Sequence, residues 1–186
     1  METKFIPGTT IPDGGAMGGG MFAALRPMIA ATNGLTLAQV CAITALEPST
    51  VQNWVKREFV AHPVAKKYGE RHLARILIIS MLRDSMKIDD VGELLRYING
   101  NADDESDDII DEPDLYDLLC EVVRGATPGA SDESLGAAID GAIDHYPLRG
   151  EAARERLAAA MRVMVHAYFA GVLARKAQQG LARLKG

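Results

Sequence analysis

The sequence has few cysteines, few aromatic residues and no long apolar run. Its two cysteines, Cys41 and Cys120, lie far apart and form no CxxC pair, which argues against a disulfide framework or a cysteine-rich metal site and favours a reducing cytoplasm. Apolar residues make up 48% of the 186 residues but aromatics only 5%. The core must therefore be built from Leu, Ile, Val, Met and Ala, a composition typical of helices. No run of about 18 apolar residues occurs, so we expect neither a membrane span nor a signal peptide.

The sequence also lacks the residue patterns of an enzyme. It contains no HExxH, and no Ser/His/Asp or Cys/His order is recognisable. His145, next to Asp144 and Tyr146, leaves two interpretations open: a proton-transfer group, or a histidine at the surface or at a helix end. Cys41 is expected to act as a small apolar residue, and Cys120, even if it faces solvent, has no neighbouring cation to make it reactive. We therefore predict no enzymatic activity, no cofactor and no metal site.

Charge is unevenly distributed along the chain. The 20 basic and 25 acidic residues give a net charge of −5. Residues 35–75 carry six bases and three acids, residues 101–146 carry 14 acids and one base, and residues 147–186 carry eight bases and two acids. This distribution excludes a uniformly basic, anion-seeking protein but leaves room for a locally basic surface.

Residues 1–34 form the first predicted region. They contain several prolines and a glycine-rich tract at 14–20, which lacks the spacing and the preceding strand of a phosphate-binding loop. We expect this region to be flexible, with room for a short helix over 21–31 that Pro27 weakens or kinks.

Two short helices separated by a tight turn are predicted between residues 35 and 58. Thr36 and Gln39 have the spacing of a capping box, which marks the start of the first helix. Pro48 suits the first position of the second helix, in which Val51 and Trp54 face the core. This arrangement is a helix-turn-helix pattern. The opposite side of the second helix is polar and basic, with Ser49, Gln52, Asn53, Lys56 and Arg57.

The rest of the first domain follows from the same kind of pattern. Pro63 favours an extended backbone just before it, so residues 59–68 are expected to form a small hairpin or wing. A third helix after Gly69 is apolar nearly all round and should be the buried centre of the domain. A fourth helix over about 88–98 ends at Gly100. The domain predicted from these elements spans residues 35–100.

Four strings of residues resemble MerR-type winged helix-turn-helix regulators. They are 37–44 (LAQVCAIT), 48–54 (PSTVQNW), 68–73 (YGERHL) and 86–95 (MKIDDVGELL). Their order and approximate spacing fit that family over residues 35–100, and the whole chain resembles an uncharacterised bacterial family with a MerR-like N-terminal domain. The resemblance implies a winged helix-turn-helix fold, a DNA-binding dimer and a C-terminal part that receives a signal.

The chain departs from the MerR pattern at the turn, in the wing and after the domain. Ala45 stands where MerR proteins often have a glycine, and a left-handed alanine would cost about 1–2 kcal/mol. Glu47 replaces the usual serine cap, and the segment 60–68 is shorter than a typical MerR wing. The long helix by which MerR proteins usually dimerise does not directly follow Gly100.

The polar side of the second helix is the predicted DNA-reading surface. Gln52 and Asn53 can make paired amide contacts with adenine, and Lys56 and Arg57 can contact guanine edges or phosphates. From the residues alone, an ordinary solvated helix face remains the alternative. Basic residues of the wing would contact the flanking DNA backbone. The predicted DNA-binding residues are Ser49, Thr50, Gln52, Asn53, Lys56, Arg57, His62, Lys66, Lys67 and Tyr68.

Residues 101–112 are predicted to be an acidic linker, and residues 113–186 a helical region for dimerisation or effector binding. Residues 101–108 are too acidic and too poor in apolar groups to pack. Within them, the stretch 103–108 lacks the acid spacing and central glycine of a calcium-binding loop. Three helices follow. The last one carries an apolar stripe that either packs in the core of one chain or forms a seam between two chains. Its members are Leu157, Met161, Met164, Val165, Tyr168, Val172 and Leu173.

From the residues and the resemblance we predict a cytoplasmic, sequence-specific DNA-binding transcriptional regulator. It would bind double-stranded DNA as a homodimer through a recognition helix over about 48–58. Its effector, a small molecule or a protein, cannot be named from the sequence. The alternative function is a protein-interaction adaptor that uses the helix-turn-helix fold and the acidic segment without binding DNA. No membrane partner is expected.

Overall fold

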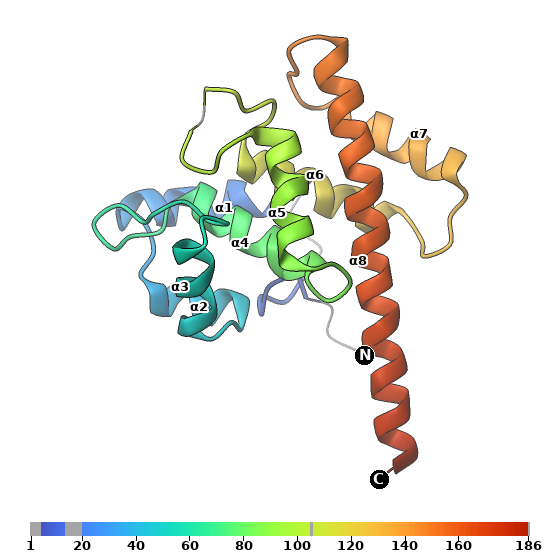
Figure 1. Ribbon diagram of the computed structural model, residues 1–186, viewed down its shortest axis with the longest axis horizontal. Helices are drawn as coiled ribbons and strands as arrows, with labels where there is room; N and C mark the ends of the chain where they lie inside the picture. Colours follow the sequence, from blue (N-terminus) through green and yellow to red (C-terminus); the bar gives the residue numbers. More distant parts are fainter. Residues whose placement is uncertain (1–4, 14–19, 105, 186) are drawn as a thin grey trace.

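The computed structural model describes residues 5–13, 20–104 and 106–185 and is mainly α-helical (Figure 1). Strand-type pairing among these residues is limited to three isolated antiparallel bridges. The mainly α prediction is therefore confirmed. Most of the glycine-rich tract (14–19) and Glu105 of the acidic segment lie outside the described residues. The helices of the described chain are α1 (Gly20–Ala31), α2 (Leu37–Thr44), α3 (Pro48–Lys56), α4 (Glu70–Leu82), α5 (Ile88–Asn99), α6 (Glu112–Gly125), α7 (Asp132–Ile143) and α8 (Glu151–Lys185).

Helix α4 forms the centre of the molecule, as its nearly continuous apolar sequence predicted. Nine of its 13 residues are buried. The helix packs most extensively against α6 and also contacts α1, α2, α5 and α8. Each large apolar side chain contributes about 1.5–3 kcal/mol to the stability of the fold when it is fully buried. The buried side chains of α4 therefore hold the N-terminal and C-terminal helices together in one core.

Helices α2 and α3 are joined by a short turn at 45–47. The predicted capping box is present: the Thr36 N–H donates to Gln39 Oε1 (2.8 Å), and the Gln39 N–H donates to Thr36 Oγ1 (3.3 Å). Ala45 follows α2 in the left-handed conformation, with φ of 55°. Helix α3 ends at Lys56, slightly before the predicted limit, because Glu58 also adopts a positive φ of 59°.

Replacing Ala45 by glycine is expected to raise the free energy of unfolding by about 0.5–1 kcal/mol. Glycine adopts a positive φ without the steric cost of a β-carbon, and part of that gain is offset by the freer unfolded chain. Urea-induced unfolding of the full chain measures the change. Ala42→Gly, at an exposed position inside α2, is the control and should lower stability instead. A loss of stability in Ala45→Gly would contradict a strained turn.

Residues 6–10, within the described segment 5–13, pack against the body, which differs from the flexible segment predicted from the composition of residues 1–34. Ile6 is only 1% exposed, and the Tyr116 hydroxyl donates a hydrogen bond to the Pro7 carbonyl (2.7 Å). The Thr10 N–H donates to the Ile43 carbonyl (2.8 Å) and so satisfies the open C-terminal end of α2. The short helix predicted over 21–31 is present as α1.

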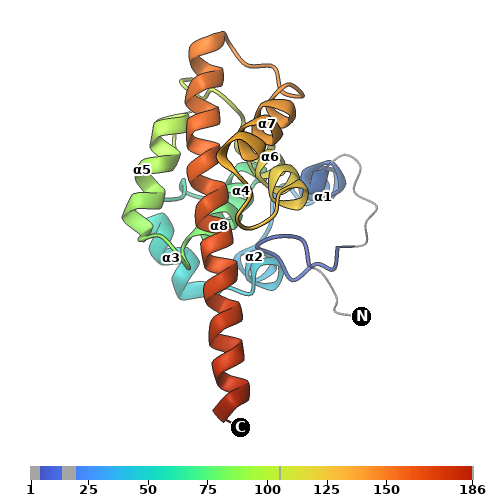
Figure 2. The same ribbon diagram turned by 90° about the vertical axis from the view of Figure 1, so that its right-hand side faces the viewer.

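Helix α8 is the longest element, and its two halves have different surroundings. Its first half lies along α5, α6 and α7, whereas its C-terminal part projects beyond the body of the molecule (Figure 2). Arg175 is paired with Asp84 close to the point where α8 leaves the body. Most of the predicted stripe therefore belongs to the core of one chain. Its members Leu157, Met161, Met164 and Val165 are buried, Tyr168 and Val172 are half-buried, and Leu173 is exposed.

Candidate nucleic-acid interface

Helix α3 presents one side to the core and the other to solvent. Val51, Trp54 and Val55 are buried, and the guanidinium of Arg83 lies 5.7 Å from the centroid of the Trp54 ring. Figure 1 shows α3 and the projecting part of α8 in different parts of the molecule. The solvent side, here called the α3 face, consists of Ser49, Gln52, Asn53 and Lys56, all exposed, with the half-buried Thr50 beside them.

Arg57 points away from the α3 face, in contrast to its predicted role. Its Nη2 lies 2.7 Å from Asp89 Oδ1 on α5, and its guanidinium lies 4.7 Å from the centroid of the Phe59 ring. Arg57 follows the last residue of α3, so its side chain turns toward α5. The pair is largely exposed and contributes little to stability. It does reduce the positive charge next to the α3 face.

A tight hairpin turn over 64–67 lies within the segment 59–68, for which a small hairpin or wing was predicted. The Lys67 N–H donates to the Val64 carbonyl (2.9 Å), and Ala65 and Lys66 have φ of 50° and 62°, which is typical of a type I′ turn. Lys66 is exposed at the tip. The Lys67 ammonium lies 3.4 Å from two backbone carbonyls just after α1, so it holds the hairpin in place.

His62 and Tyr68 flank the hairpin and differ in exposure. Tyr68 is 5% exposed, and its backbone exchanges two 2.8 Å hydrogen bonds with Leu35. Its ring packs edge-on against His72, so the predicted DNA contact of Tyr68 is corrected to a core position. His62 is exposed, but its backbone N–H donates a hydrogen bond to Asp103 Oδ1 (3.3 Å). An acid therefore stands beside this predicted phosphate contact.

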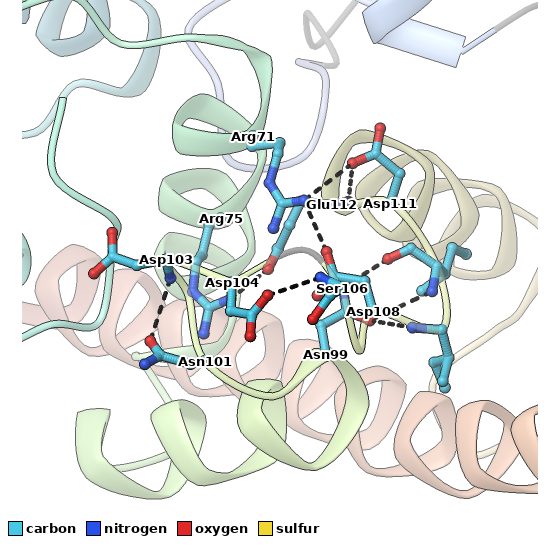
Figure 3. A network of polar contacts seen from close by, with 12 residues as sticks. Arg71, Arg75, Asn99, Asn101, Asp103, Asp104, Ser106, Asp108, Asp111 and Glu112 are labelled. Carbon is cyan, nitrogen blue, oxygen red and sulfur yellow. Dashed lines mark hydrogen bonds and ion pairs between the residues drawn. The ribbon is translucent and has the colours of Figure 1, made fainter. Parts of the chain in front are cut away.

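The acidic segment folds back onto α4, which corrects the prediction of a linker too acidic to pack (Figure 3). Arg71 Nη1 lies 2.8 Å from Asp108 Oδ2, and Arg75 is paired with Glu112 at the start of α6. Arg75 also donates through Nε to the Phe59 carbonyl (2.7 Å). Two arginines of α4 thus connect the chain after α3 with the end of the acidic segment. Residues 103, 104, 106 and 107 are exposed, as predicted.

Asn99 fixes the point where the acidic segment re-enters the core. This residue is 1% exposed. Its Nδ2 donates to the Ile110 carbonyl (2.7 Å), and its Oδ1 accepts from the Ile109 N–H (3.2 Å). One buried amide therefore satisfies backbone groups that would otherwise be left without partners.

Burial raises the pKa of several groups in the acidic segment and in α6. The pKa of Asp108 is raised to about 6, because the loss of solvation outweighs the attraction of Arg71. The pKa of Glu112 is raised for the same reason, despite its pairing with Arg75. Burial also raises the pKa of the Cys120 thiol to about 12. Cys120 is 2% exposed and so does not face solvent, and its raised pKa disfavours the thiolate form that reacts.

Asp108→Asn is expected to make stability less dependent on pH. The pKa of Asp108 in the folded chain, about 6, exceeds the ordinary value of 3.8. The folded state therefore holds this proton more tightly. The resulting stabilisation is fully present below about pH 4 and is lost as the pH rises through about 6. The free energy of unfolding should fall over this range, and Asp108→Asn should remove part of the fall.

Urea unfolding at several pH values between 4 and 7 measures this effect. Burial also raises the pKa of Asp117 to about 6 and raises the pKa of Glu112, so these two carboxyl groups should account for much of the remaining fall. Asp90→Asn, at an exposed position of α5, is the control and should keep the original slope. An unchanged slope in Asp108→Asn would contradict the assignment.

Other kinds of site find little support in the described part of the chain. No group of three or more His, Cys, Asp and Glu side chains there could hold a metal ion. A cavity of about 490 Å³ lies between the end of α1, the hairpin and the starts of α4 and α6. Of its charged lining residues, Glu70 is paired with Arg26 and Arg71 with Asp108. By length and composition α8 could cross a membrane, but 44% of its most apolar window is buried inside the protein.

Three residues that shape this surface were not identified from the sequence. Asp89 pairs with Arg57, Asp103 approaches His62, and Arg83 lies over a tryptophan ring. Each belongs to a different element from its partner, so no local pattern reveals the contact. For Asp89 the sequence offers only its place in the first turn of a helix, where acids are favoured by the helix dipole.

Comparison with known proteins finds a family match over the central part of the chain. Residues 31–119 match the family model described as "Domain of unknown function (DUF1836)", a range that includes α2 to α5, the acidic segment and the first part of α6. A 108-residue stretch is 30% identical to "Uncharacterized protein YkrK" of Bacillus subtilis (strain 168). The alignment covers 53% of this chain and 46% of that relative, so the chain spans about half the length of the protein it matches. No solved structure matches.

Proposed function

We propose that this chain is a sequence-specific DNA-binding transcriptional regulator that acts as a homodimer. In this proposal α2, the turn and α3 form a MerR-like helix-turn-helix, the hairpin over 64–67 is a short wing, and α3 enters the major groove. The observation that carries the proposal is the α3 face. Its amide and basic side chains are exposed, while Trp54 on the opposite side is 3% exposed and anchored in the core.

Each side chain of the α3 face offers a distinct contact to DNA. The amides of Gln52 and Asn53 present a donor and an acceptor that complement N6 and N7 of adenine, and Lys56 suits guanine or a phosphate. Ser49, in the first turn of α3, suits a phosphate held at the N-terminus of the helix. Because α3 is fixed by buried side chains, little further ordering of its backbone is needed on binding.

The charge around the α3 face supports selective rather than strong nonspecific binding. Arg57 pairs with Asp89, and His62 stands beside Asp103, so part of the local positive charge is neutralised. Nonspecific affinity depends on cations that displace counterions from phosphates, and a single copy should therefore bind random DNA weakly. Two copies would double the contacts and place two α3 helices in major grooves about 34 Å apart.

Selection of binding sites from randomised duplexes tests the proposal. The full chain is expected to enrich one recurring palindromic sequence, with half-sites separated by about one turn of DNA. A salt titration with the enriched duplex and a scrambled duplex then separates specific from nonspecific binding. Absence of enrichment would contradict DNA recognition. It would favour the protein-interaction adaptor, for which the exposed acids beside the hairpin are the supporting observation.

A further inference from the structure

Helix α8 carries a second apolar stripe on the side turned away from the core. Its members recur every three or four residues, which is the heptad pattern of a coiled coil. All of them are exposed; Val163 is 45%, Leu173 52% and Leu184 86% exposed. This outer stripe consists of the small or apolar residues Ala159, Val163, Ala170, Leu173, Ala177, Gly180 and Leu184, and of one polar residue, His166.

We propose that the outer stripe pairs with the outer stripe of a second copy of this chain in antiparallel orientation. This inference rests on the homodimer in the proposed function but not on DNA binding. The stripe extends about 38 Å along the helix axis. Its first half lies on the body, and its second half projects beyond the body (Figure 1). A two-fold axis near residues 171 and 172 would lay each projecting half on the body-bound half of the other copy.

The sizes of the side chains fit this antiparallel register. With the axis between residues 171 and 172, Val163 lies opposite the partner's Gly180, and Leu184 lies opposite the partner's Ala159. In the two central layers Leu173 of each copy meets Ala170 of the other. Each of these layers combines a large side chain with a small one, so the two helices can approach closely without leaving voids.

Charge complementarity favours the same orientation. Helix α7 packs along the body-bound half of α8, and its exposed side is acidic, whereas the projecting half of α8 is basic. In an antiparallel pair each basic half runs beside the acidic α7 of the other copy. In a parallel pair the two basic halves would lie side by side and repel. The exposed acids of α7 are Asp132, Glu133 and Asp140, and the bases of the projecting half include Lys176, Arg183 and Lys185.

A lipid membrane is the other occupant that the composition of α8 would suit. A spanning helix would have to withdraw its inner stripe from the core, since 44% of its most apolar window is buried in the body. Separating those buried side chains from α4 and α6 would expose apolar surface of the body to water, which is unfavourable. The folded body therefore favours a second copy, rather than lipid, as the partner of the outer stripe. Binding to lipid vesicles is one outcome of the experiment below.

Light scattering after gel filtration tests for the dimer. The full chain at micromolar concentration is expected to show twice its mass of 20.0 kDa. Leu173→Glu places a carboxylate in each of the two central layers and is expected to give a monomer of unchanged helicity, because Leu173 is exposed within one chain. Gln179→Glu, on the same projecting half but outside the outer stripe, is the control and should remain dimeric.

Disulfide cross-linking tests the orientation, in a Cys41→Ser background. Ala159→Cys and Leu184→Cys combined in one chain are expected to yield a covalent dimer. Leu184→Cys alone should stay uncrosslinked, because its two thiols would lie about 38 Å apart. A monomeric full chain, cross-linking by Leu184→Cys alone, or flotation with phosphatidylcholine vesicles would overturn the proposal. If the chain is a dimer but selects no DNA sequence, the DNA-binding proposal is overturned and the proposed dimer interface is not.

Discussion

Glu112→Gln is expected to lower the free energy of unfolding by about 3–5 kcal/mol. The side chains of Arg75 and Glu112 are 5% and 2% exposed and are paired with each other. Arginine remains charged inside proteins, so a neutral glutamine leaves a buried cation without a counter-ion. The hydrogen bond from Arg75 Nε to the Phe59 carbonyl would remain but would not neutralise that charge. Urea-induced unfolding of the full chain at neutral pH gives the measurement.

Two further variants separate the buried charge from a general effect of substitution. Glu93→Gln, at an exposed position of α5, should change stability by less than about 0.5 kcal/mol. Adding Arg75→Met to Glu112→Gln should recover most of the loss, because no uncompensated charge then remains in the core. A loss of under about 1 kcal/mol in Glu112→Gln, or no recovery in the double variant, would show that the pair is better solvated than the structure indicates.

The triple variant Gln52→Ala, Asn53→Ala, Lys56→Ala is expected to lose affinity for the selected duplex while remaining folded. Each paired amide contact contributes about 1–3 kcal/mol of discrimination. Loss of two such contacts corresponds to a roughly 30-fold to 20,000-fold weaker Kd. Affinity for random DNA should fall far less, because Lys56 is the only one of the three that carries charge. Fluorescence anisotropy with both duplexes measures the two effects.

Stability and a matched control show whether the affinity loss arises at the α3 face. All three substituted residues are exposed, so the free energy of unfolding should change by less than about 0.5 kcal/mol for each. Gln178→Ala with Gln179→Ala, on the projecting part of α8, should leave affinity unchanged. Equal affinity of the triple variant and the original chain for the selected duplex would remove the α3 face from DNA recognition.

Local patterns predicted the local features of the fold. The capping box at Thr36 and Gln39, the start of α3 at Pro48 and the stop of α5 at Gly100 all follow from the geometry of helix ends, and the structure confirms them. The left-handed conformation of Ala45 agrees with a turn that usually takes glycine. These features depend on residues close in sequence, which is why one sequence suffices to find them.

Contacts between distant elements could not be predicted in this way. The acidic segment is held by Asn99 and by arginines of α4, and the segment around Pro7 is held by Tyr116. Composition suggested that both segments were loose, because it counts polar groups without showing which of them find partners. The predicted DNA contact of Tyr68 is wrong for a related reason. Its burial depends on Leu35, which lies far from it in the sequence but beside it in the structure.

Repeating the site selection with Asn53→Ala measures most directly whether α3 reads bases. The account predicts that the enriched palindrome loses its preference at one base pair in each half-site and keeps its preference at the others, because one side chain specifies one position. An enriched sequence identical to that of the original chain, with the same preference at every position, would contradict base reading by the α3 face.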